Sequence, residues 1–174
     1  MFGGESVVIF SRVEFDCPMI EEISSRFRAV GDFYSVFFGT SGISSIGDGP
    51  AAFLAEVLQS DELAKAVPKL LPLNLSAGKD CAAMNRYEFE GSLVGVLLQG
   101  TCTDRVVCDE REASEVARAM MKEAVLRPNG HIQVFRMNDP SWSALTNQAT
   151  LWCAYFVFES SRHVCWFVCF ADPY

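Results

Sequence analysis

Cys81 and His131 are the two residues of this sequence whose types best suit chemistry at neutral pH. The 174 residues include only two histidines, His131 and His163, and seven cysteines. Residues 80–83, Asp-Cys-Ala-Ala, can begin a short helix, where the helix dipole lowers the pKa of a thiol. Residues 130–135 are typical of a strand that starts with a histidine. A cysteine at a helix start, facing a histidine on a strand, is the arrangement of papain-like thiol hydrolases.

The local sequences around this pair, DCAAM and GHIQVF, resemble those of the NlpC group of cell-wall peptidases. The resemblance covers these two segments alone. It implies Cys81 as the nucleophile, His131 as the base, and Asn138 or Asp139 as the group that orients the imidazole. The simpler alternative is a buried Cys81 and a surface His131. We favour this alternative, because a predicted hairpin and a long predicted helix separate the two residues, and we predict no catalytic residue.

No metal or cofactor site is predicted. The nearest approach to a zinc site is the set His163, Cys165 and Cys169, which project from one face of a predicted strand. Cys165 and Cys169 would lie about 13 Å apart along that strand, too far for one tetrahedral ion. The Gly-rich segment 39–49 lacks the Gly-Lys-Ser/Thr ending of a phosphate-binding loop and the spacing of a dinucleotide fingerprint.

The pattern of apolar residues predicts the elements that would position these side chains. Strands are predicted over 6–15, 33–38, 131–137, 151–158 and 163–170, and helices are predicted to begin at Pro18, Pro50, Ser60 and Asp109. Two apolar segments, 86–90 and 93–101, flank Gly91-Ser92 and predict a further hairpin. Such an order indicates an α+β fold: one domain over residues 1–174, with a mainly antiparallel sheet packed by about four helices.

The charge of the chain excludes some classes of partner. The sequence has 22 acidic and 14 basic residues, a net charge of −8, and no cluster of Lys and Arg. Binding of nucleic acid, or of an anionic membrane surface, is therefore disfavoured. An odd number of cysteines without a CxxC pair indicates reduced thiols, and the N-terminal residues lack the pattern of a signal peptide. These features predict a cytoplasmic protein.

The composition favours a non-enzymatic protein that binds another protein. An acidic chain can be steered towards a basic partner, and aromatic residues anchor interfaces. Small acidic α+β proteins of this class often neutralise a toxic or basic partner, so the concrete prediction is an immunity protein or antitoxin that contacts a basic toxin or effector domain. The predicted contact residues are Glu110, Glu112, Glu115 and Trp142, the last in a predicted loop.

The apolar C-terminal segments leave a third possibility open. Residues 151–158 and 163–170 are apolar on both faces, which predicts central strands covered by helices or by a partner. A homodimer formed through this hairpin is therefore a further prediction, and the sequence leaves the choice between core and interface open.

Overall fold

A computed structural model describes residues 9–41, 50–101, 104–107, 109–124 and 131–172 of the chain. In this part of the chain, six strands form one sheet in the order β1-β2-β6-β5-β4-β3, and every pairing is antiparallel. The strands are β1 (Ile9–Val13), β2 (Asp32–Ser41), β3 (Cys81–Met84), β4 (Ile132–Met137), β5 (Leu151–Glu159) and β6 (Val164–Asp172). The predicted α+β class with a mainly antiparallel sheet is confirmed.

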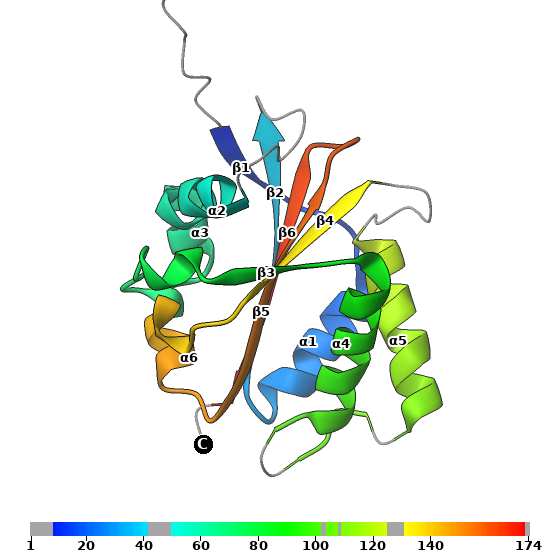
Figure 1. Ribbon diagram of the computed structural model, residues 1–174. Coiled ribbons are helices and arrows are strands. Elements are labelled where there is room, and N and C mark those ends of the chain that lie inside the picture. The colour runs from blue at the N-terminus through cyan, green and yellow to red at the C-terminus, as the bar shows by residue number, and fades with distance from the viewer. Residues whose placement is uncertain (1–8, 42–49, 102–103, 108, 125–130, 173–174) are drawn as a thin grey trace, which may run out of the picture.

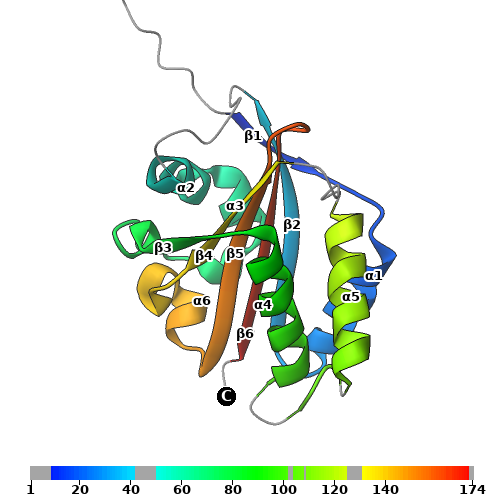
Figure 2. The same ribbon diagram turned by 45° about the vertical axis from the view of Figure 1, so that its right-hand side comes forward.

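Helices cover both faces of this sheet (Figures 1 and 2). On one face lie α1 (Pro18–Arg28), α4 (Arg86–Gln99) and α5 (Glu110–Glu123). On the other lie α2 (Pro50–Gln59), α3 (Asp61–Ala66), α6 (Ala144–Asn147) and the 3₁₀ turns Pro68–Leu70, Ala77–Lys79 and Pro140–Trp142. Among the described helices, none is long and apolar enough to cross a membrane.

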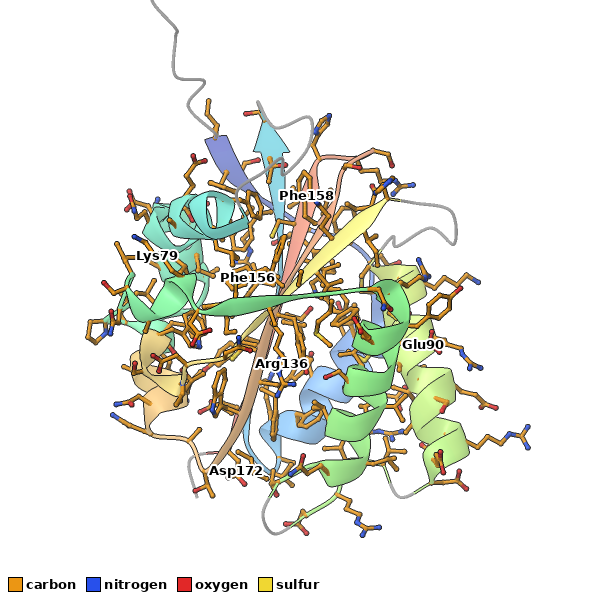
Figure 3. The ribbon with its side chains drawn as sticks, in the orientation of Figure 1. Lys79, Glu90, Arg136, Phe156, Phe158 and Asp172 are labelled. Carbon is orange, nitrogen blue, oxygen red and sulfur yellow. The ribbon has the colours of Figure 1, made fainter. Side chains whose placement is uncertain are left out.

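The C-terminal hairpin forms the centre of the core. All nine residues of β6 are buried, as are seven of the nine residues of β5. Successive side chains of a strand point to opposite faces, so Tyr155 and Val157 join the core under α1, α4 and α5. Phe156 and Phe158 point to the opposite core, beneath α2 and α6 (Figure 3). Helices therefore cover both faces of the hairpin, and neither face is open to a second copy of the chain.

The hairpin predicted around Gly91-Ser92 is wrong, because residues 86–99 form the single helix α4. Asn85 begins the helix: its side chain accepts the N–H groups of Tyr87 and Glu88, and the Glu88 carboxylate accepts the N–H of Asn85 in return. Such a reciprocal cap supplies partners for the backbone groups of the first turn. The ring of Phe89 then packs on Tyr155, with ring centroids 5.3 Å apart.

The short helix predicted to begin near Cys81 is also absent, since residues 81–84 form the edge strand β3. Cys81 pairs with Met137 and Met84 pairs with Val134 on β4. Pairing with β4 decides this conformation, because the four residues Cys-Ala-Ala-Met have no strong strand preference of their own.

The predicted starts of the other helices are confirmed. The side chains that cap α1 and α5 are not all those that the sequence predicts. The Glu123 carboxylate of α5 accepts the N–H groups of Met19 (2.9 Å) and Ile20 (3.0 Å) at the start of α1. Asp109 accepts the N–H of Glu112 at the start of α5. The Glu112 carboxylate contacts Arg26 of α1 and does not complete the expected capping box.

Most of the Gly-rich segment 39–49 lies outside the described residues, as do residues 6–8 of the first predicted strand.

Candidate functional site

The structure separates the two residues of the possible thiol hydrolase. Cys81 pairs with Met137 at one end of β4, whereas His131 immediately precedes Ile132 at the other end. Six residues of extended strand correspond to about 20 Å. Asn138 lies at the Cys81 end, where its amide donates to the Asp80 carboxylate at 3.0 Å. The side chains that would have to form a catalytic unit are therefore not brought together.

The surroundings of Cys81 also disfavour a reactive thiolate. Burial, and then the negative charge of Asp80, raise the pKa of the Cys81 thiol above its ordinary value. A nucleophilic cysteine needs the opposite change, which a helix start or a neighbouring cation would supply. Cys81 lies on a strand and not at a helix start. At neutral pH the protonated thiol predominates.

We expect Cys81 to react slowly with iodoacetamide, with a rate that rises only above about pH 8.5, the ordinary range of a thiol. His131→Ala should leave this rate unchanged, because the imidazole lies at the other end of β4. Mass spectrometry of the labelled Cys81 peptide between pH 5 and 10 measures the rate. Fast labelling at pH 6 that disappears in the His131→Ala variant would contradict this arrangement.

The remaining described cysteines are buried or nearly so, and none is in a disulfide bond. Cys165 and Cys169 both point into the core beneath α2. Burial raises the pKa of the Cys165 thiol to about 12. Within the ranges that the structure describes, no group of three His, Cys, Asp or Glu side chains is arranged to hold a metal ion.

The three predicted contact glutamates are all exposed in the first turns of α5, with Glu110 on the side towards α4 and Glu112 on the side towards α1. Glu112 pairs with Arg26 of α1 at 3.2 Å, and Glu115 pairs with Arg111 at 3.1 Å. Glu110 makes no ion pair with any described residue. These exposed pairs leave the carboxylates accessible to water and to a partner.

Trp142 does not lie at the surface. Its side chain is fully buried beneath the sheet, with ring centroids 6.3 Å from those of Phe156 and Phe167. The exposed aromatic residue on the side of α5 is Tyr87 of α4, which is 81% exposed. The sequence does not identify Tyr87 as an exposed contact residue, because its apolar pattern predicts a strand over residues 86–90.

Tyr87 borders a shallow hollow of about 490 Å³ between α4 and α5, whose lining consists of Tyr87, Glu90, Gly91, Val94, Ser114 and Arg118. Glu90 of α4, which is labelled in Figure 3, pairs with Arg118 of α5 at 2.7 Å across this hollow. Glu110, Ser114 and Arg118 are four residues apart in turn, so they share one side of α5. Glu110 therefore lies next to the hollow, and the exposed side of α5 continues from it through Glu115 to Glu112 beside α1. This exposed region is here called the α4–α5 surface.

A second and larger cavity, of about 550 Å³, lies between α1 and β2. Arg28, Ser24 and Glu21 of α1 line one side, and Ser35 and Phe37 of β2 line the other. The sequence does not predict this cavity, because it depends on where β1 stops pairing with β2.

The chain matches no protein-family model, and a comparison with curated proteins finds no significant match.

Proposed function

We propose that this chain is a non-enzymatic domain that binds another protein by direct contact through the α4–α5 surface. The observation that carries the proposal is an exposed aromatic side chain, Tyr87, on the same helix pair as the exposed glutamates of α5. Interfaces are commonly anchored by one or two aromatic side chains with charged residues around them. The separation of Cys81 from His131 supports the non-enzymatic part of the proposal.

The charge of this surface favours a basic partner. Five carboxylates gather at the start of α5 and beside it on α1, namely those of Glu22, Asp109, Glu110, Glu112 and Glu115. They are accompanied by two guanidinium groups, Arg26 and Arg111, so the negative charge is only partly compensated. Uncompensated surface charge speeds the association of oppositely charged proteins. An immunity protein or antitoxin that neutralises a basic toxin or effector domain is the form of this function that we favour.

The experiment compares capture from cell extract by the tagged chain and by the triple variant Glu110→Lys, Glu112→Lys, Glu115→Lys. We expect the wild-type chain to capture one basic protein in stoichiometric amount, and the triple variant to capture at least tenfold less of it. Tyr87→Ala should also weaken capture, because the variant removes the proposed aromatic anchor.

The matched control is the triple variant Glu56→Lys, Asp61→Lys, Glu62→Lys, with the same change in net charge. These residues lie on α2 and α3, on the opposite face of the sheet. Capture by the control should equal that of the wild-type chain. Equal losses in both triple variants would show that net charge alone is responsible and would contradict a role for the α4–α5 surface.

A further inference from the structure

Within the part of the chain that the structure describes, a stretch of β2 has a strand on one side only. β6 pairs with β2 from Asp32 to Gly39, whereas β1 pairs with it only from Phe37 to Ser41. After Val13 the chain leaves the sheet and leads into α1. Among the described residues, no strand therefore neighbours the other side of residues 32–36, and the 550 Å³ cavity lies beside its Ser35 end.

The backbone groups of Phe33 and Ser35 point into this gap. Peptide groups of successive residues in an antiparallel strand point to alternate neighbours. The N–H of Thr40 donates to the carbonyl of His163 at the β6 side, so the even-numbered residues of β2 face β6 and the odd-numbered ones face away from it. No backbone bond outside the regular strand pairs reaches Phe33 or Ser35 from the described residues. These groups of both residues lack a strand partner among the described residues. Ser35 lines the cavity, whereas Phe33 lies just beyond it and is 5% exposed.

The opposite wall of the cavity is one side of α1. Glu21, Ser24 and Arg28 follow each other at intervals of three and four residues, which places them on one helix face. Between this wall and β2, the rings of Phe15 and Phe37 pack edge to face with centroids 5.0 Å apart. A groove with a bare strand edge on one side and a helix on the other has the geometry in which an extended peptide adds to a sheet.

The charges along the groove are polarised. α1 leads through a short turn into β2, so the two run in opposite directions, and Arg28 lies at the end near Asp32. Glu14 and Glu21 lie at the other end, where β1 leaves the sheet, and Arg12 lies there with them, so this end keeps a net negative charge. Arg28 forms no ion pair with a described residue. A strand that continues the line of β1 would run with its C-terminal end towards Arg28.

We propose that the groove between α1 and the bare edge of β2 binds an extended peptide by strand addition. The peptide pairs with the backbone of Phe33 and Ser35, places a basic residue beside Glu14 and Glu21, and places a carboxylate beside Arg28. That carboxylate is either the C-terminus of the peptide or an acidic side chain. The gap accommodates about four to five extended residues. This site is separate from the α4–α5 surface, and the inference does not rest on the proposed function.

The test uses a library of fluorescent pentapeptides, each made with a free and with an amidated C-terminus, and measures binding by polarisation. We expect selected peptides to carry Lys or Arg near the N-terminal end and a carboxylate at the C-terminal end. Loss of binding on amidation identifies the C-terminus as the carboxylate, and binding that survives amidation identifies an acidic side chain. Both results support the site. Absence of any binding above background, or selected peptides without this charge polarity, would overturn it.

Two variants locate the bound peptide. Arg28→Glu should weaken binding of carboxylate-bearing peptides at least tenfold. Ser35→Pro removes the N–H that would pair with the peptide, and proline is tolerated where an N–H faces away from the neighbouring strand. Its control, Ser35→Ala, loses the hydroxyl that accepts the N–H of Trp166 but keeps the backbone donor, and should still bind.

Equal binding by wild type, Arg28→Glu and Ser35→Pro would place the peptide elsewhere and overturn the proposal. Self-association in sedimentation that Arg28→Glu abolishes would overturn it in favour of a second copy of the chain. Arg28→Glu and Ser35→Pro should leave capture of a protein through the α4–α5 surface unchanged. A failure of peptide binding in the groove is therefore distinguishable from a failure of the proposed function.

Discussion

Trp142→Ala should lower the free energy of unfolding by about 3–5 kcal/mol, the usual cost of removing a fully buried indole ring. The ring is wholly buried between the 3₁₀ turn Pro140–Trp142 and the sheet, against Phe156 and Phe167. Its removal leaves a cavity under the centre of the sheet. Urea unfolding at 25 °C, followed by circular dichroism, measures the change.

Trp142→Phe is the matched control for this variant. The indole Nε1 of Trp142 is buried and has no hydrogen-bond partner among the described residues, so phenylalanine removes volume but breaks no hydrogen bond that the structure describes. We expect a loss of about 1–2 kcal/mol. Capture of a partner through the α4–α5 surface should be unchanged, since Trp142 lies in the core. If Trp142→Ala and Trp142→Phe lost the same free energy of unfolding, the volume of the ring at this position would not be what stabilises the fold.

Gly100→Ala should destabilise the fold by about 2–4 kcal/mol. Gly100 ends α4 with φ of 60°, a conformation that L side chains rarely adopt. A Cβ atom there would lie 2.3 Å from the carbonyl oxygen of Asp104 and 2.8 Å from Cα of Arg105. Both atoms belong to the backbone, and the same carbonyl accepts the N–H of Thr101. The segment after α4 would have to move, and the midpoint of thermal unfolding reports the cost.

Gly95→Ala is the control, because Gly95 lies in the interior of the same helix. Apart from the backbone of its own helix, a Cβ atom at this position meets no atom of the described residues within 4 Å. Alanine is the better helix former, so this variant should stabilise the protein by about 0.5–1 kcal/mol. A destabilised Gly95→Ala variant, or an unaffected Gly100→Ala variant, would contradict the observed end of α4.

The sequence predicted the elements whose apolar pattern allows one interpretation. The hairpin of β5 and β6 is apolar on both faces apart from Glu159 and Asp172 at the strand ends, and it lies at the centre of the sheet as expected. Pro18 and Pro50 mark helix starts because proline fits the first helical turn. For these elements, local preference and tertiary packing agree.

Helix α4 could not be identified from its apolar pattern. Phe89, Leu93 and Leu97 form its buried stripe, but Val94 and Val96 on its flanks are also apolar, so strand and helix periods both fit. Two glycines in its sequence further favoured a turn. The sequence signal that distinguishes a helix from a strand here is Asn85 followed three residues later by Glu88, a reciprocal cap that marks a helix start.

The candidate sites depend on distances that no local pattern contains. Cys81 and His131 carry suitable chemistry, yet the register of β3 on β4 places them at opposite ends of a strand. Trp142 follows a turn signal, which favoured a surface position, but the 3₁₀ turn directs its ring into the core. The groove beside β2 exists because β1 ends its pairing at Phe37, and this end point is a property of the assembled sheet.

The measurement that tests the central claim most directly is the association rate of the chain with its captured partner at increasing NaCl concentration. If acidic residues of the α4–α5 surface steer a basic protein, the rate should fall at least tenfold between about 10 mM and 500 mM salt, as screening shortens the reach of the charges. The Glu110→Lys, Glu112→Lys, Glu115→Lys variant should associate slowly at every salt concentration. An association rate that is independent of salt and identical in that variant would contradict the claim.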